Sequence, residues 1–240
     1  MINFYETNDL KDYLTTSHNP NFQLHNINIP SRMIITGASG GGKTNALLNL
    51  LKLFSAKKGT FDTIKIYCKA KDEPIYEFIS DKTKGKIEII DDLSKLNEIK
   101  INDFNSNDNH LIIFDDLLLT KHKIIQEIWI RGRKKNITSI YLSQSYHQTN
   151  ILLRKNTRYF IFLKLIPRDI KTILKEMSLS VNQETLINMY NYATKDKLNC
   201  FLIDNDETDE TKKYRKNFNQ FLSPEYFKNN DDIPTATPID

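Results

Sequence analysis

Cysteine and histidine are few in this sequence of 240 residues, and neither type is spaced to bind a metal. Cys68 and Cys200 each lie inside an apolar run, which indicates buried, reduced thiols in an intracellular protein. The histidines are scattered, at His18, His25, His110, His122 and His147. The sequence therefore predicts neither a disulfide framework nor a zinc site built from histidine and cysteine.

Long apolar runs are also missing. The best candidate for a membrane span, residues 159–166, is short and contains Lys164. The N-terminal stretch MINFYETNDLKDY carries early acidic residues and no apolar core, so it does not resemble a secretory signal. We therefore expect a soluble, intracellular protein without a membrane partner.

Charge of one sign is not in large excess either. The chain has 34 basic and 30 acidic residues and a formal net charge of +4, which permits binding to a polyanion but does not by itself indicate it. With 39% hydrophobic residues, the length fits one α/β domain with extensions. We expect an N-terminal lead-in over 1–30, one domain over 31–220 and an irregular tail over 221–240.

The hydrophobic patterns predict alternating strands and helices. Strands are expected over 31–36, 63–69, 86–90, 110–116, 137–142 and 159–165, and helices over 43–58, 73–80, 120–131, 167–177 and 183–193. Thr120 would cap the third of these helices. Residues 199–204 and 211–218 are expected to form a terminal hairpin. This alternation predicts an α/β fold with a mainly parallel sheet covered by helices on both faces.

Glycine is scarce, and its placement is informative. Four of the seven glycines lie within GASGGGKT, residues 37–44, which matches the phosphate-binding pattern Gly-x-x-x-x-Gly-Lys-[Ser/Thr] between a predicted strand and a predicted helix. Glycine lets successive N–H groups surround phosphate oxygens, Lys43 can reach the β and γ phosphates, and Thr44 can bind Mg²⁺. The expected nucleotide-binding residues are Gly37, Ala38, Ser39, Gly40, Gly41, Gly42, Lys43, Thr44 and Asn45.

A second acidic motif follows downstream. HLIIFDD, residues 110–116, is an apolar strand that ends in two carboxylates, as in a Walker B motif. Asp115 would hold Mg²⁺ together with Thr44, and Asp116, pointing elsewhere, would polarise the attacking water. The Asp-x-x-Gly and [Asn/Thr]-Lys-x-Asp motifs of switch GTPases are absent, so ATP is the expected nucleotide.

Gln144 lies just past the next predicted strand, where ligands bind in such sheets. Its amide would contact the γ-phosphate or the attacking water and report hydrolysis to the next loop. A polar residue at a strand end is also ordinary, so this role depends on the neighbouring motifs.

Arginine is scarce, with only seven residues in the chain. Two of them, Arg131 and Arg133, lie between the acidic strand at 110–116 and the strand at 137–142 that precedes Gln144. A planar, permanently charged guanidinium suits a transferring phosphoryl group. An arginine finger acting on a neighbouring subunit is one interpretation, with Arg133 ahead of Arg131 and Arg154 as a third candidate. A solvated helix end is the alternative, because Lys134 and Lys135 follow.

Together, TGASGGGKT, LIIFDDLL, IRGRKKNITSIYLSQSYHQ and LLRKN resemble the genome-packaging ATPases of large double-stranded DNA viruses and virophages, a branch of the HerA–FtsK superfamily. The resemblance covers about residues 31–160, and YFIFLK and KKYRKNF further along are similar. Many bacterial relatives have glutamate where this chain has Asp116, which leaves the general-base role of this shorter acid open.

The resemblance implies a P-loop NTPase of the RecA/ASCE-like type, with strand order 5-1-4-3-2 and extra C-terminal strands. It implies ATP and Mg²⁺ as cofactors, and Lys43, Asp115, Asp116, Gln144 and either Arg131 or Arg133 as catalytic residues. It also implies a pentameric or hexameric ring that moves duplex DNA, independently of sequence, into a preformed capsid through a capsid or portal vertex protein. The location would be the host cytoplasm or a viral factory, or the virion itself.

Two other functions remain open at this level. One is a helicase or DNA pump of the same superfamily, and the other is an assembly or regulatory protein in which nucleotide only switches partners. For a motor, residues 69–71 and the loop 146–155, which includes Lys155, are candidate contacts with DNA phosphates, although ordinary solvated surface is the alternative for both.

Overall fold

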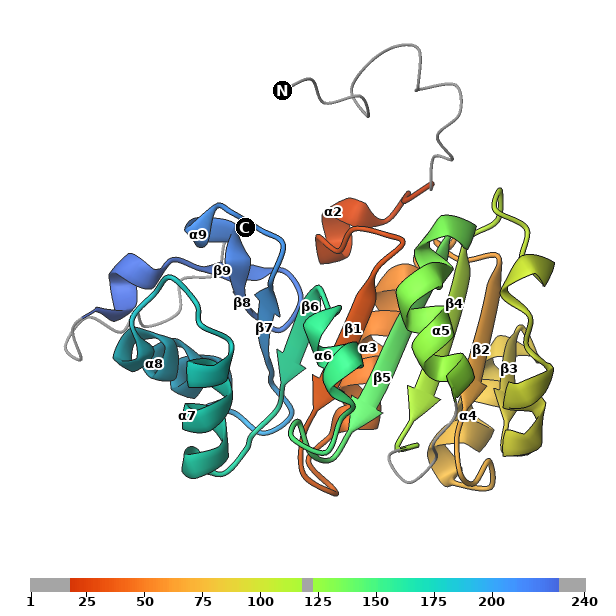
Figure 1. Cartoon of the computed structure of the whole chain (residues 1–240), viewed down its shortest axis with the longest axis horizontal. Helices are drawn as coiled ribbons and strands as arrows, with labels where there is room; N and C mark the ends of the chain where they lie inside the picture. Colours follow the sequence, from red (N-terminus) through yellow and green to blue (C-terminus); the bar gives the residue numbers. More distant parts are fainter. Residues whose placement is uncertain (1–17, 118–122, 229–240) are drawn as a thin grey trace, which may run out of the picture.

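The computed structural model describes residues 18–117 and 123–228. Within them, nine strands form one sheet in the order β3-β2-β4-β5-β1-β6-β7-β8-β9 (Figure 1). The first six strands are parallel and the last three are antiparallel. The parallel strands are β1 (Arg32–Thr36), β2 (Thr63–Tyr67), β3 (Ile87–Ile90), β4 (His110–Asp115), β5 (Ile137–Ser143) and β6 (Tyr159–Phe162).

The predicted strand order is confirmed. When β3 is left out and the remaining strands are numbered along the chain, the series β6-β1-β5-β4-β2 reads 5-1-4-3-2. β3 adds a further parallel strand at one edge. The other edge carries β7 (Phe201–Asp204), β8 (Tyr214–Lys216) and β9 (Gln220–Leu222), which are the expected extra C-terminal strands.

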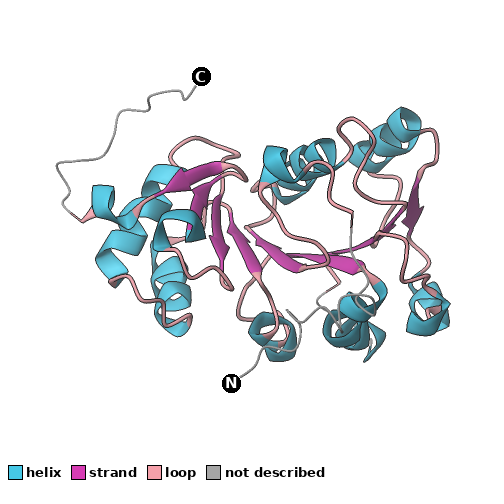
Figure 2. Cartoon of the chain, turned by 90° about the horizontal axis from the view of Figure 1, so that it is seen from above, coloured by secondary structure: helices cyan, strands magenta, loops and turns pink. Residues whose placement is uncertain are grey.

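Helices cover both faces of the sheet, as Figure 2 shows. Alternate residues of β1 explain why both faces need cover: Met33 and Ile35 pack with α3 (Lys43–Phe54) and α4 (Pro74–Thr83), whereas Ile34 belongs to the core on the other face. That second core includes α5 (Lys123–Arg131), α6 (Ile151–Lys155), α7 (Pro167–Glu176) and α8 (Gln183–Ala193). A strand buried on both faces has a continuous apolar sequence, as β1 has.

Short helices complete the described chain. α2 (Phe22–His25) and α9 (Glu210–Lys213) are single turns of α-helix. The 3-10 helices are η2 (Leu93–Glu98), η3 (Ile101–Asp103), η4 (Gly132–Lys135) and η5 (Pro224–Phe227). The expected cap at Thr120 lies outside the described residues.

The loosely structured lead-in predicted for residues 1–30 is wrong for its last part. The Asn21 side chain donates hydrogen bonds to the carbonyl oxygens of Phe54 and Ala56, at 2.9 and 2.8 Å, and Ile27 is fully buried. These contacts attach the segment to the end of α3. The packed domain therefore includes residues before the expected boundary at 31.

The C-terminal end also differs from its prediction. The hairpin of β7 and β8 is present, but Asp209 caps a helical turn, α9, where a strand was expected from residue 211. β9 and η5 then continue into the segment expected to be irregular, and buried Phe227 packs on Tyr192 with ring centroids 5.4 Å apart. Side-chain burial far from the hairpin, which the local pattern does not record, extends the folded domain.

Candidate nucleotide site

Residues 37–42 form the loop that joins the carboxyl end of β1 to the first turn of α3. Gly40 and Gly42 have φ angles of +66° and +94°, which L side chains rarely adopt. A Cβ atom at Gly42 would also lie 2.6 Å from Leu198 Cδ2. The backbone conformation at Gly42 therefore favours glycine at the last position of the loop.

Lys43 lies back over this loop. Its Nζ donates hydrogen bonds to Gly37 O at 3.0 Å and to Ala38 O at 3.2 Å, and only 8% of the residue is exposed. Burial lowers the pKa of Lys43, while the nearby carboxylates of Asp115 and Asp116 oppose that effect. A phosphate group in the loop would give this buried ammonium an anionic partner.

Asp115 is the last residue of β4. It therefore lies at the carboxyl end of the parallel strands, as the loop at 37–42 does. The hydroxyl of Tyr76, a residue of α4 that is 1% exposed, donates a hydrogen bond to Asp115 Oδ2. Burial raises the pKa of Asp115 despite that hydrogen bond and the nearby Lys43, which both lower it. Burial, Asp115 and its hydrogen bond in turn raise the pKa of Tyr76. A cation beside Asp115 would favour the ionised carboxylate.

Asp116 has a separate set of partners. Its φ angle of +54° turns the chain sharply after β4, and Asp is among the residues that tolerate this conformation. Gln144 Nε2 donates to Asp116 Oδ2 at 2.6 Å, and Lys69 Nζ lies 3.4 Å from the same oxygen. Adjacent carboxylates thus reach different neighbours, as the sequence predicted, although their catalytic roles stay predictions.

Gln144 is exposed at the start of a loop that is otherwise held in place. Thr149 Oγ1 donates to Ser143 Oγ at 2.8 Å, and Ser143 Oγ donates to Ser145 O at 2.7 Å. These bonds fasten the loop to the end of β5. The sensor role of Gln144 stays a prediction.

The donor set suits Mg²⁺. Thr44 on the first turn of α3 supplies a hydroxyl and Asp115 a carboxylate, and hard cations of this kind prefer oxygen ligands. These residues would hold the ion, with phosphate oxygens and water as the remaining ligands. Tyr76 would fix the orientation of Asp115 from behind.

Arg131 and Arg133 lie just before β5 begins, at the amino end of the parallel strands and therefore at the opposite end from the phosphate loop. β5 has seven residues, and at about 3.3 Å per residue it places these side chains about 20 Å from the carboxyl edge. Arg131 pairs with Glu127 at 2.7 Å, whereas Arg133 is exposed and has no ion pair among the described residues. Neither guanidinium can complete the site of its own chain.

Arg154 is held within its own subunit. It pairs with Glu176, donates to Thr149 O at 3.1 Å and stacks on the Tyr146 ring at 4.7 Å. These contacts keep the side chain only 12% exposed. The geometry does not favour Arg154 as a finger.

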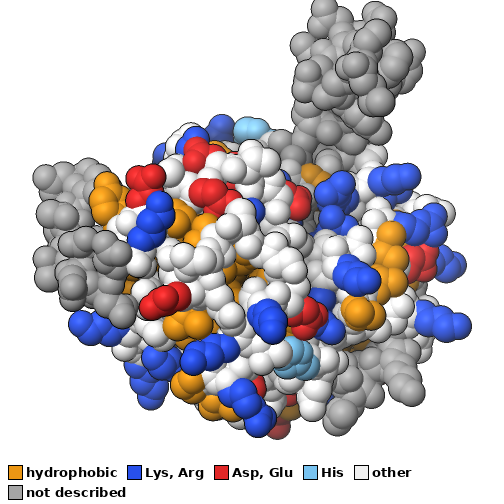
Figure 3. Space-filling model, turned by 60° about the vertical axis from the view of Figure 1, so that its left-hand side comes forward, with side chains coloured by type: hydrophobic (Ala, Val, Ile, Leu, Met, Phe, Trp, Pro, Cys, Tyr) orange, Lys and Arg blue, Asp and Glu red, His pale blue; other side chains and the backbone are white. Residues whose placement is uncertain are grey.

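The two lysines of the candidate DNA contact at 69–71 carry acidic partners. Lys69 pairs with Asp116, and Lys71 lies 3.3 Å from Asp91. On the face shown in Figure 3, Lys and Arg side chains are interspersed with acidic ones and do not form one continuous basic patch. The DNA contact therefore stays a prediction.

Sequence reasoning missed Tyr76 and assigned Lys69 a different role. Residues 69–71 were considered only as a candidate contact with DNA, and Tyr76 lay within the predicted helix at 73–80 with no role assigned. Their partners are 47 and 39 residues away along the chain. Only the parallel pairing of β2 with β4, which brings the segment after β2 beside the end of β4, could have indicated both contacts.

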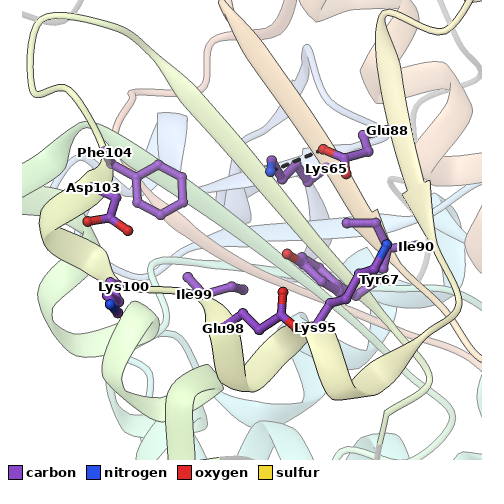
Figure 4. Close-up of a pocket in the computed structure, with 10 residues that line it drawn as sticks. All are labelled: Lys65, Tyr67, Glu88, Ile90, Lys95, Glu98, Ile99, Lys100, Asp103 and Phe104. Atoms are coloured by element: carbon purple, nitrogen blue, oxygen red, sulfur yellow. Dashed lines mark ion pairs between the residues drawn. The ribbon is translucent and has the colours of Figure 1, made fainter.

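A separate pocket of about 370 Å³ lies under η2 and η3, against the strands β2 and β3 (Figure 4). Its lining mixes cations with anions, including an ion pair of 3.1 Å between Lys65 and Glu88. It shares no residue with the loop at 37–44, and the phosphate site does not include it. No helix within 18–117 and 123–228 is long and apolar enough to cross a membrane.

Solved structures resemble this fold. The DNA-packaging ATPase B204 from Sulfolobus Turreted Icosahedral Virus matches with a TM-score of 0.55 and 16% identity, covering 74% of this chain and 94% of that one. B204 from Sulfolobus turreted icosahedral virus 2 in complex with AMPPCP matches with a TM-score of 0.55 and 13% identity, covering 75% and 94%. At these identities, the likeness concerns the fold.

Sequence relatives lie among poxvirus proteins. DNA packaging protein OPG160 of vaccinia virus (strain Copenhagen) is 29% identical over 174 residues, covering 69% of this chain and 64% of that protein. The monkeypox virus protein of the same description is also 29% identical, with 58% of its length covered. This chain thus spans less than two thirds of the length of these relatives. The model of the family described as "Poxvirus A32 protein" matches residues 21–214, which is well over half of the 240, and the chain belongs to that family.

Proposed function

We propose that this chain is a Mg²⁺-dependent ATPase that drives double-stranded DNA into a viral capsid. The observation that carries the proposal is the meeting of Lys43, Asp115, Asp116 and Gln144 at the carboxyl end of the parallel strands, where α3, the end of β4 and the residue after β5 supply them. The family relationship and the names of the relatives support packaging as the use of that activity.

The residues divide the work of hydrolysis among them. The backbone of 37–44 and the Lys43 ammonium would bind the phosphates, and bound Mg²⁺ would neutralise charge on the β and γ oxygens. Asp115 and Thr44 would hold that ion. Asp116 would orient and polarise the attacking water, and Gln144 would contact the γ-phosphate or that water. ATP analogues and AMP occur in complexes of the structurally similar B204, which supports nucleotide binding here.

The site is completed across a subunit interface in this proposal. Arg133 lies too far from the phosphate loop of its own chain, so it would act as a finger only on the loop of a neighbouring copy. Such an interface joins two different surfaces and closes as a ring, with a pentamer or hexamer as the expected assembly. The ring would move DNA through phosphate contacts at a capsid or portal vertex, in the cytoplasm or viral factory of an infected cell.

The central experiment measures ATP turnover with and without long duplex DNA. We expect stimulation by DNA, and we expect Lys43→Ala to abolish ATP binding while Lys58→Ala, an exposed lysine beyond the end of α3, leaves it unchanged. ATP affinity unaffected by Lys43→Ala would remove the phosphate-loop assignment. A turnover rate indifferent to DNA would reject the motor and favour a nucleotide-gated regulator, and strand separation on a forked substrate would favour a helicase.

A further inference from the structure

The helix α7 carries apolar and basic side chains on opposite faces. Three apolar residues are at most 2% exposed and pack in the core: Ile170, Ile173 and Leu174. Arg168, Lys171 and Lys175 are exposed, and at about 100° per residue they fall within about 60° of one another around the helix axis. Because the core fixes the apolar face, these three cations, the basic row, face solvent together.

The basic row has little neutralising charge. Among the described residues, Lys171 and Lys175 form no ion pair. Arg168, whose side chain is 89% exposed, reaches only Asp169, at 4.0 Å. The lysines of the candidate DNA contact at 69–71, in contrast, each have an acidic partner at a shorter distance. The row therefore offers cations that are free to meet an anionic partner.

The last residue of α7 is tied to the loop that follows Gln144. Glu176 Oε1 accepts a hydrogen bond from Arg154, and Glu176 Oε2 lies 3.6 Å from His147 Nδ1. Arg154 also donates to Thr149 O, at 3.1 Å. Figure 1 shows α7 at the end of the molecule toward which the parallel strands point, the end that carries the loop at 37–42. The row is thus on a helix that contacts a loop of the candidate site.

Duplex DNA is the polyanion that fits the row best. Three and four helical residues separate its members, which places the cations about 4.5 and 6 Å apart along the axis. Each strand of a duplex presents a phosphate about every 3.4 Å along its axis, so each cation can meet a different one. A membrane surface fits less well, because a helix that lies in lipid inserts its apolar face, and that face of α7 is packed in the core.

We propose that the basic row of α7, formed by Arg168, Lys171 and Lys175, binds the phosphate backbone of duplex DNA. Guanidinium and ammonium groups only donate hydrogen bonds, so such contacts hold any sequence equally well. This assignment rests on the proposed function, in which duplex DNA is the substrate. It adds a DNA-binding surface outside residues 69–71 and the loop 146–155.

Fluorescence anisotropy of the full chain with a labelled duplex of random sequence, recorded over a series of salt concentrations, tests the assignment. Lys171→Gln combined with Lys175→Gln removes two phosphate contacts, so the slope of log Kobs against log salt concentration should become shallower by about 1.8. Lys57→Gln combined with Lys58→Gln is the matched control. It changes two exposed lysines beyond the end of α3, neither of which has an ion pair in the described part of the chain, and should leave the slope unchanged.

Melting curves check that both double variants fold, and the substitutions at exposed positions should leave the melting temperature unchanged. A shallower slope for the α7 variant alone supports the row. An unchanged slope, or an equal loss in the control, overturns the row and leaves the proposed function intact. An unchanged DNA slope with lost binding to phosphatidylserine vesicles would also overturn it, in favour of a membrane contact. Failure of the unaltered chain to bind duplex DNA would instead overturn the proposed function itself.

Discussion

The side-chain amide of Gln144 donates a hydrogen bond of 2.6 Å to Asp116 Oδ2. Gln144 follows β5 and Asp116 follows β4, so the bond joins the ends of two adjacent parallel strands. A proposed sensor and a proposed base are thus in direct contact. A γ-phosphate that drew the amide toward itself would free one oxygen of Asp116 for the attacking water.

Asp116 and Gln144 should differ in how much turnover they control. We expect Asp116→Asn to keep ATP binding and to lower kcat by about 10²–10⁴-fold, the usual contribution of a general base. Gln144→Ala should lower kcat less, because Lys69 still contacts Asp116. Steady-state kinetics with ATP measures both, and an Asp116→Asn variant with normal kcat would contradict the assignment.

Lys69 and Lys71 form a matched pair for testing the contact with Asp116. Lys69→Met should lower kcat by up to about fivefold, since exposed ion pairs contribute about 0–1 kcal/mol, with little change in KM for ATP. Lys71→Met removes a similar pair, with Asp91, and should leave kcat unchanged. Equal effects of the two changes would show that general surface charge, and not the position of Asp116, is responsible.

Asp115 should destabilise the magnesium-free protein at neutral pH. Burial raises its pKa above the ordinary value of 3.8, so folding disfavours the ionised form, and stability falls as the pH rises through the raised pKa. Asp115→Asn, which can still accept from Tyr76, should raise the melting temperature at pH 7 by about 2–4 °C for each kcal/mol of relief. The difference should shrink as the pH approaches 3.8, where the wild-type carboxyl is protonated in the fold.

Magnesium gives the control for this prediction. With ATP present, Mg²⁺ should stabilise the wild-type protein and should have a much smaller effect on Asp115→Asn, because the ion loses its carboxylate ligand. Melting curves recorded with and without Mg²⁺ measure both effects. A lower melting temperature for magnesium-free Asp115→Asn would show that the buried carboxylate is a stabilising group.

Arg133 should act on a neighbouring subunit. Arg133→Ala and Lys43→Ala proteins should each be inactive, and mixing them should restore part of the ATPase activity, because some interfaces then combine an intact phosphate loop with an intact arginine. Arg154→Ala mixed with Lys43→Ala serves as the comparison: Arg154 is bound to Glu176 and Tyr146 of its own chain, so its loss should mainly lower stability. Absence of rescue with Arg133→Ala would reject the finger.

Much of the fold was predictable because its signals are local. The apolar runs of β1, β4 and β5 and the helical spacing of α3 appear directly in the sequence, and the order of the parallel strands followed from the family resemblance. The segment at 19–28 was misjudged because its anchors, such as Asn21 on Phe54 O, depend on contacts 33 residues apart. Its few apolar residues, Phe22, Leu24 and Ile27, stand among polar ones and form no pattern long enough to predict a packed element.

The sequence alone determined the phosphate loop, the paired carboxylates and the amide at the end of β5, because each depends on residues adjacent along the chain. A Gly-rich turn needs its own glycines, and a carboxylate at a strand end needs only that strand. Tertiary structure alone decided what those groups touch: Tyr76 on Asp115, Lys69 on Asp116 and Leu198 on Gly42. It also distinguished the two arginine candidates. The folded sheet places Arg133 at the amino end of β5, far from the phosphate loop, and pairs Arg154 with Glu176. Such contacts arise from the pairing of strands and the packing of helices, which bring distant segments together.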